Sequence, residues 1–233
     1  MGSVSSDGIK RYLKQTKELY GDELFLELDL VPSVDEAKEG VPQPSPLPAF
    51  PSDLETFNQQ INECQNCALG KSRTNFVFGV GDPNASLVMV GEAPGEQEDL
   101  KGEPFVGRAG QLLDKILAAI GRTRQKDVYI CNVLKCRPPN NRNPLGGEVE
   151  ECEPYLIHQI NLIQPKLIVA LGRVAGKTLL NVDKPLKSMR GTLHDYHGTP
   201  MIVTYHPAAL LRNPNWKPET WKDFKWIRSI IDA

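Results

Sequence analysis

Four cysteines in this chain have the spacing of metal ligands. Cys64 and Cys67 form a C-x2-C pair in a polar stretch, and Cys136 and Cys152 follow much later, separated by fifteen residues. We expect these thiols to bind one metal centre rather than to form two disulfides, because the N-terminus lacks the apolar leader of a secreted chain. Zinc and iron both accept four thiolates, so the ligands alone do not identify the metal. Cys131 lies inside an apolar run and is predicted to be buried and uninvolved.

The turn that follows residues 86–90 is rich in groups that can bind a planar ligand. Gly91, Pro94 and Gly95 allow a tight turn whose backbone N–H groups point into a pocket, an arrangement suited to a carbonyl-bearing ring. Phe105 comes after the next turn, in polar company. An aromatic side chain there serves either as a hydrophobic plug or as a platform on which a ring stacks, and the residues alone favour neither.

Two further polar side chains lie at the ends of apolar runs. Asn132 carries both a hydrogen-bond donor and an acceptor, which the edge of a pyrimidine requires. His206 stands where a strand should end, and a histidine at the carboxyl end of a strand in an α/β sheet is favoured as a functional group. Shortly after it come Leu210, Leu211 and Arg212, a combination that suits an apolar wedge beside a phosphate-binding cation.

A sheet is needed to bring these residues together. Four apolar runs rich in β-branched residues occur at 86–90, 127–131, 166–171 and 200–205, with helical patterns between them. Buried strands that alternate with helices indicate a parallel sheet covered on both faces. We therefore predict a three-layer α/β/α fold with a central, mainly parallel four-stranded sheet. Its ligand site should lie at the carboxyl ends of the strands.

Composition divides the chain near residue 50. Residues 1–50 hold 5 Lys and Arg against 9 Asp and Glu, which leaves 22 of the 27 basic and 20 of the 29 acidic residues for the rest. Helical spacing at 9–19 and six prolines within 31–51 predict a short amphipathic helix and then a linker. We predict an N-terminal extension over 1–50 and one domain over 51–233, whose first helix starts near Ser52.

Hydropathy and charge indicate the location of the protein and the kind of partner that it can bind. No apolar run reaches the roughly 18 residues that cross a bilayer, so we expect a cytoplasmic protein without a membrane partner. The segment from Lys177 to Arg228 carries nine basic residues against four acidic ones. This excess is compatible with phosphate contacts and equally with a solvated surface.

Three motifs and the cysteine pattern together resemble a known family. The segments GEAPGEQED…GEPFVGRAGQLLD, CNVLKCRPPNNRNP and HPAALLRNP, with four cysteines at this spacing, are similar to those of the family 4 iron-sulfur uracil-DNA glycosylases. The resemblance runs from about Phe57 to the C-terminus. It implies a monofunctional hydrolase of base excision repair that flips uracil out of DNA, hydrolyses its N-glycosidic bond and leaves an abasic site.

The resemblance also implies roles for individual residues. The uracil-binding residues would be Gly91, Glu92, Ala93, Phe105, Asn132 and His206. Phe105 would stack on the ring, Asn132 would read its N3–H and O4 edge, and His206 would hydrogen-bond O2 as negative charge develops. The residues that enter the duplex would be Leu210, Leu211 and Arg212. A [4Fe-4S] cluster would be held by Cys64, Cys67, Cys136 and Cys152.

The residue that positions the hydrolytic water departs from the family pattern. Some members of the wider superfamily carry an aspartate in the first motif, where this chain has Ala93. Glu92 is the nearest replacement and joins His206 as a catalytic candidate, with Glu98 second. Related covalent uracil-binding proteins use a histidine in a basic loop, but KCRPPNNRNPLGG contains none, which favours an enzyme that turns over.

Two alternatives and several partner predictions accompany this interpretation. The chain could instead be a nucleic-acid-binding or redox protein whose metal centre is the functional part, or a structural zinc domain. As an enzyme we expect a monomer that acts on single- or double-stranded DNA at the nucleoid, with a possible protein partner for the extension. The cluster would hold the segment around Asn132, and Lys135, Arg137 and Arg142 would meet the phosphate backbone.

Overall fold

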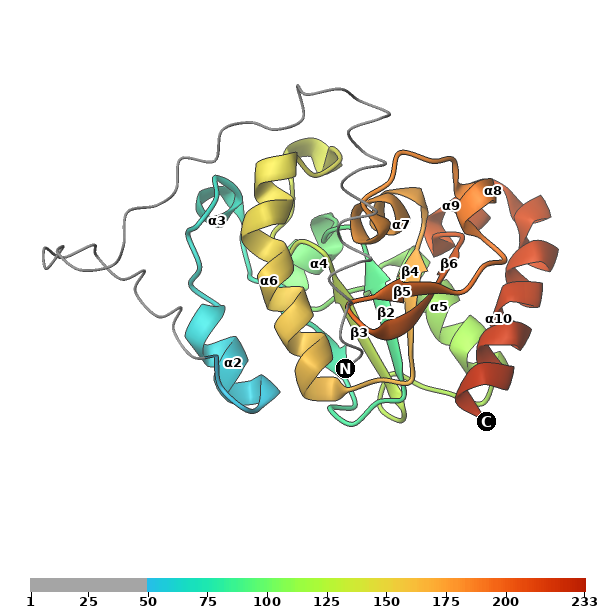
Figure 1. Cartoon of the computed structure of the whole chain (residues 1–233). Coiled ribbons are helices and arrows are strands. Elements are labelled where there is room, and N and C mark those ends of the chain that lie inside the picture. Colours follow the sequence, from blue (N-terminus) through green and yellow to red (C-terminus); the bar gives the residue numbers. More distant parts are fainter. Residues whose placement is uncertain (1–49) are drawn as a thin grey trace, which may run out of the picture. The chain divides into compact units, whose positions relative to one another are not determined.

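The computed structural model describes residues 50–233, in which a six-stranded sheet lies between two layers of helices (Figure 1). The strand order is β1-β3-β2-β4-β6-β5. The strands are β1 (Val80–Gly81), β2 (Leu87–Gly91), β3 (Val128–Asn132), β4 (Leu167–Leu171), β5 (His194–Tyr196) and β6 (Thr199–Thr204). Neighbours among β3, β2, β4 and β6 pair in parallel, whereas β1 and β5 pair antiparallel at the two edges.

The three-layer fold and its four parallel strands are therefore confirmed, but the predicted sheet was two strands too small. Both missed strands are edge strands of two or three residues, β1 and β5, and they are only partly buried. Such short, mixed segments lack the apolar run by which the central strands were recognised. Cys131 lies in the middle of β3 and is buried in the core, as predicted.

Alternate side chains of the central strands face the two helical layers. Val88 and Val90 pack with one layer, whereas Leu87 and Met89 pack with the other. The first layer contains α6 (Gly146–Ile163), α7 (Arg173–Leu180) and α8 (Leu186–Met189). The second contains α5 (Arg108–Ala119) and α10 (Lys217–Ile231). Because both faces of the sheet are covered, the central strands β2, β3 and β4 are buried along their whole length rather than alternating.

Short elements complete the described part of the chain. They are α2 (Leu54–Ile61), α3 (Leu69–Ser72), α4 (Glu96–Lys101), α9 (Pro207–Arg212) and the 3-10 turns η2 (Pro139–Asn141) and η3 (Pro214–Trp216). Asp53 caps α2 by accepting a hydrogen bond of 2.8 Å from the backbone N–H of Thr56, so the predicted helix start near Ser52 is confirmed. The predicted helix at 9–19 lies outside the described residues. From residue 50 to 233, no helix is long and apolar enough to span a membrane.

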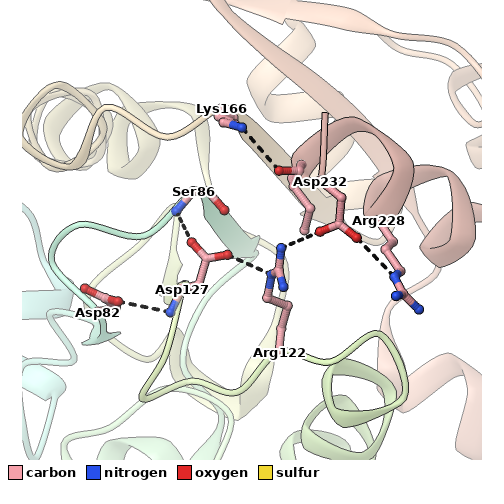
Figure 2. A network of polar contacts seen from close by, with 8 residues as sticks. Asp82, Ser86, Arg122, Asp127, Lys166, Arg228 and Asp232 are labelled. Atoms are coloured by element: carbon pink, nitrogen blue, oxygen red, sulfur yellow. Dashed lines mark hydrogen bonds and ion pairs between the residues drawn. The ribbon is translucent and has the colours of Figure 1, made fainter.

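A polar network joins the amino ends of the central strands to the C-terminal helix (Figure 2). Asp127 accepts from the backbone N–H of Ser86 at 2.8 Å, and Arg122 forms ion pairs with Asp127 and Asp232. The Lys166 ammonium donates to the main-chain oxygen of Ile231. Ser86, Asp127 and Lys166 directly precede β2, β3 and β4. The network therefore lies at the amino-terminal ends of these strands, opposite the predicted site at their carboxyl ends.

Candidate active site

A cavity of about 450 Å³ lies at the carboxyl ends of β2, β3 and β6. The segments that follow these strands supply most of its wall, as predicted. The predicted site residues that line it are Glu92, Ala93, Phe105, Asn132, His206 and Arg212. The structure therefore brings residues from four separate segments of the chain into one pocket.

Gly91 forms the close contact between the first two strands of this site. It is the last residue of β2 and pairs with Asn132, the last residue of β3. A Cβ atom on Gly91 would overlap the side-chain oxygen of Asn132 and would approach the Phe105 ring to 2.8 Å. Glycine is therefore needed at this position, because any side chain would displace the amide or the ring.

Phe105 is held in an unusual backbone conformation. Its φ of 55° lies in the left-handed region, which is costly for a bulky residue. A Cβ atom on Gly110 in α5 would overlap the main-chain oxygen of Phe105, so the helix can approach only because residue 110 is glycine. The Phe105 ring lies 5.4 Å from the His206 ring, centroid to centroid, with 31° between their planes. Two ring systems thus border the same cavity.

Glu98 and Arg124 support the Phe105 turn from both sides. The Glu98 carboxylate accepts hydrogen bonds of 3.1 and 3.2 Å from the two backbone N–H groups that follow Phe105. The Arg124 guanidinium donates to the main-chain oxygens of Pro104 and Phe105 at 3.1 and 2.9 Å. These charge-assisted bonds offset the backbone strain at Phe105. Sequence analysis gave no signal for the role of Arg124, which lies nineteen residues from the turn.

The environment of His206 selects its neutral form and one tautomer. As the N-cap of α9, its Nδ1 accepts a hydrogen bond of 3.1 Å from the backbone N–H of Ala208. In the neutral ring the proton is therefore on Nε2, which becomes a donor. Burial, with a smaller contribution from Arg212, lowers the pKa of His206 to about 4. The glycine at position 172 allows this packing, because a Cβ atom added there would lie only 2.9 Å from the Cβ atom of His206.

Glu92 lines the same two cavities as His206, the first cavity and a neighbouring one. It is half-buried. Burial raises its pKa above the ordinary value of a glutamate. A carboxylate whose pKa is raised toward the working pH is suited to accept a proton.

One prediction for the α9 segment is wrong. Leu210 is 1% exposed and packs inside the domain, so it is not placed to enter DNA. Leu211 is 38% exposed, and Arg212 lies on the surface. Successive residues of an α-helix point about 100° apart, and the direction of α9 places Leu210 against the domain and Leu211 toward solvent. The apolar group presented to solvent is therefore Leu211 alone.

The four predicted ligand cysteines come together in one apolar cluster. Cys64 and Cys67 follow α2, Cys136 follows β3 and Cys152 lies on α6. All five cysteines of the described residues are free thiols, and no disulfide joins any two of them. No group of three or more His, Cys, Asp and Glu side chains between residues 50 and 233 lies around one point as the ligands of a single metal ion do.

Hydrogen-bond donors surround these sulfur atoms. The Arg73 guanidinium donates to Cys136 Sγ, the Tyr155 hydroxyl to Cys64 Sγ and the Lys135 backbone N–H to Cys152 Sγ, each at 3.3 Å. Burial raises the pKa of Cys152 to about 11 and also raises that of Cys136. Buried thiols in this setting become thiolates only with compensating positive charge, which Arg73 and a bound metal can supply.

Lys135 connects the cysteine cluster to the cavity. Its side chain is fully buried, so the prediction that it meets phosphate is wrong. Instead its ammonium donates to the main-chain oxygen of Asn132 at 2.8 Å and to the Gln159 side chain at 2.6 Å. Arg142 is also paired within the protein, through two hydrogen bonds to Glu148. Lys135 therefore helps to position the end of β3, a role that the sequence did not indicate.

Comparisons with known proteins agree on one family. A model of the Uracil DNA glycosylase superfamily matches residues 78–225. The chain is 47% identical over 185 residues to the type-4 uracil-DNA glycosylase of Archaeoglobus fulgidus, covering 76% of this chain and 92% of the relative. It is 44% identical to the type-4 enzyme of Sulfurisphaera tokodaii, covering 76% and 84%. It is also 44% identical to that of Pyrobaculum aerophilum, covering 73% and 91%.

Proposed function

Because this chain belongs to the uracil-DNA glycosylase superfamily, we propose that its 450 Å³ cavity binds a uracil extruded from DNA. The protein is a uracil-DNA glycosylase of base excision repair, a hydrolase of N-glycosyl bonds. The observation that carries the proposed site is the convergence of an aromatic ring, an amide and a neutral histidine on one cavity: Phe105, Asn132 and His206.

Each of these groups matches one part of uracil. The Phe105 ring offers a stacking surface for the planar base. The Asn132 oxygen accepts from N3–H, and its amide nitrogen donates to O4. The turn of Gly91, Glu92 and Ala93 contributes backbone contacts. The Phe105 turn is held before any ligand arrives, so the site needs little rearrangement to receive the base.

The chemistry follows from charge development during bond cleavage. When the bond between N1 and C1′ breaks, its electrons stay with the base, and the sugar becomes cation-like. Because the pKa of His206 is lowered to about 4, the ring is a neutral imidazole at neutral pH, and its Nε2–H group donates to O2 and stabilises the anion. A water adds to C1′ and transfers a proton to Glu92. Glu98 accepts two backbone hydrogen bonds at the Phe105 turn, which favours Glu92 over Glu98 for this task.

A direct assay tests the activity. A DNA strand with one uracil should be cut at that position by alkali after incubation with the protein, because abasic sites are alkali-labile. A strand that stays intact over a range of salt concentrations would contradict the assignment. A covalent complex that survives denaturation would instead indicate a binding protein that does not turn over.

The rate of base release should depend on the ionisation of Glu92. Because only its carboxylate can accept the proton, the rate should rise with pH through the pKa of Glu92, which burial places above that of an exposed glutamate. We expect Glu92→Gln to lower the rate about 100-fold and to remove this acidic limb of the pH profile. The measurement is single-turnover release of uracil over roughly pH 4 to 8, a range that includes the titration of ordinary glutamate and histidine side chains.

Glu98→Gln is the matched comparison. It should weaken the Phe105 turn and lower the melting temperature while leaving the acidic limb in place. If the limb disappears in Glu98→Gln and persists in Glu92→Gln, the two roles are exchanged.

Asn132 should decide between uracil and cytosine. Cytosine carries an acceptor at N3 and a donor at C4, the reverse of the uracil pattern, so it leaves both amide groups unpaired. In Asn132→Asp a protonated carboxyl can donate to N3, so we expect a loss of discrimination worth about 1–3 kcal/mol, the cost of leaving a buried polar group unsatisfied. The ratio of kcat/KM for uracil to that for cytosine measures it. An unchanged ratio would mean that another residue reads this edge.

For the cysteines we propose a [4Fe-4S] cluster bound by Cys64, Cys67, Cys136 and Cys152. Four free thiols in one apolar cluster, with donors to three of the sulfurs, support this assignment. Such a cluster would join the α2 segment, β3 and α6 and thereby stabilise the end of β3. None of the residues assigned to base release is a cysteine, which supports a structural role over a redox protein.

The remaining partner predictions belong to the same proposal. We propose Leu211 as the group that enters the space left by the extruded nucleotide and Arg212 as a phosphate contact. One chain supplies every proposed site residue, which fits a monomer. We also propose that the protein acts in the cytoplasm, on the DNA of the nucleoid. A protein partner for residues 1–50 remains a prediction, because residues 1–49 lie outside the described part of the chain.

A further inference from the structure

A second cavity of about 550 Å³ adjoins the uracil pocket. The two cavities share Glu92, His206 and Arg212 in their walls, so they lie next to one another. The second lies beside the ends of β4 and β6, between the start of α7 and the α9–η3 segment. None of the roles assigned above explains its presence.

Its wall contains an aromatic pair that is partly open to solvent. The rings of Tyr205 and Trp216 are stacked, with centroids 4.9 Å apart and 14° between their planes. The Arg190 guanidinium lies 4.3 Å from the centre of the Tyr205 ring and forms an ion pair with the buried Asp223. The Tyr205 ring therefore packs against both Trp216 and Arg190, whereas Trp216 is 38% exposed. A large aromatic surface of this kind can extend its stack by one more ring.

Charge and shape at this cavity suit a nucleotide. Arg173 and Arg212 line it and are exposed, so they can meet phosphate groups, with Glu92 as the acidic group at the inner end. Leu186 and Ala209 add apolar surface. Stacking aromatics beside arginines are the usual means of holding unpaired bases, because every base offers a π-face.

We propose that the second cavity is a subsite for the base adjacent to the extruded uridine, stacked on Trp216. The inference rests on the proposed function, since the wall that this cavity shares with the uracil pocket is what places the neighbouring nucleotide there. In a duplex that base is paired and stacked on its neighbours, whereas in a single strand it is free to turn toward Trp216. The subsite therefore favours single-stranded substrates.

The test removes the base and the ring separately. Single-stranded oligonucleotides carry one uracil, and the base on its 5′ side or on its 3′ side is replaced by hydrogen, which leaves the phosphates intact. Loss of that base on one side should lower kcat/KM of the parent enzyme about 10-fold, the order expected for one stacked base. On the intact strand, Trp216→Ala should lower kcat/KM by about the same factor. On the strand that lacks the base, Trp216→Ala should lower kcat/KM little further.

Two variants separate stacking from structural damage. Trp216→Phe keeps a ring and should recover most of the loss. Trp221→Ala removes another exposed tryptophan, on α10 and outside the cavity wall, and should behave as the parent. If the parent is indifferent to both missing bases, or if Trp216→Ala loses the same factor on every strand, the subsite is wrong.

A binding measurement keeps the inference separate from the activity. A uracil-free single strand should quench the tryptophan fluorescence of the parent and of Trp221→Phe, but much less that of Trp216→Phe. Absence of uracil release with quenching intact would overturn the proposed function and leave Trp216 as a site that stacks bases of single-stranded DNA. Equal quenching in all three proteins would overturn the subsite.

Discussion

His206→Ala is expected to lower kcat for uracil release by about 100- to 1,000-fold, the cost of removing one preorganised donor to a developing anion. KM should change little, because the hydrogen bond to O2 strengthens only as the glycosidic bond breaks. The backbone N–H of Ala208 donates a hydrogen bond to Nδ1 of His206, so the proton of the neutral ring is on Nε2. This geometry is present without substrate. Single-turnover kinetics on a single-stranded uracil substrate measures the effect.

The pH profile supplies a second readout for His206. With its pKa near 4, the ring is neutral throughout the physiological range, so no inflection is expected near pH 6.5. The same shift affects stability. The unfolded chain takes up this proton before the folded chain does, so the free energy of unfolding should fall as pH drops from 6.5 toward 4. An inflection near pH 6.5 that vanishes in His206→Ala would mean that the imidazolium is the active form.

His197→Asn is the matched control. His197 is exposed in the turn between β5 and β6 with a φ of 50°, a conformation that asparagine tolerates. Its kcat should equal that of the parent. If His206→Ala raises KM and leaves kcat unchanged, the histidine contributes to binding and another group stabilises the anion.

Cys136→Ser is expected to have the second large effect, the loss of the metal centre and of much of the stability. Cys136 belongs to the cysteine cluster and follows β3, so its loss separates that strand end from α2 and α6. Metal binding contributes to folding free energy directly, and typical domains have only about 5–15 kcal/mol in total. We expect a colourless protein with a greatly lowered melting temperature, measured by visible absorbance, iron content and thermal unfolding.

Cys131→Ala provides the comparison for this experiment. Cys131 is buried in the same strand but packs in the main core, so its replacement should leave colour and iron content unchanged. A parent protein that is colourless and holds stoichiometric zinc would replace the iron-sulfur assignment by a zinc site. Iron content retained in Cys136→Ser would show that this cysteine is no ligand.

Much of this protein can be predicted from its sequence because the signals are local. Continuous apolar runs identify the four central strands, since a strand buried on both faces needs apolar side chains at every position. The position of His206 directly after such a run places it at the carboxyl edge of the sheet. The motifs and the cysteine spacing identify the family without reference to any contact.

Tertiary structure decides which side chain faces which neighbour. Leu210 and Leu211 are equivalent in the sequence, and the direction of α9 buries one and exposes the other. From the sequence, Lys135 is predicted to be a surface cation. In the structure it is buried between β3 and α6, where its ammonium donates to Asn132 and Gln159. The second cavity likewise depends on the stacking of Tyr205 with Trp216, eleven positions further along the chain. Local patterns specify elements and residue types, whereas orientation and burial depend on contacts between distant segments.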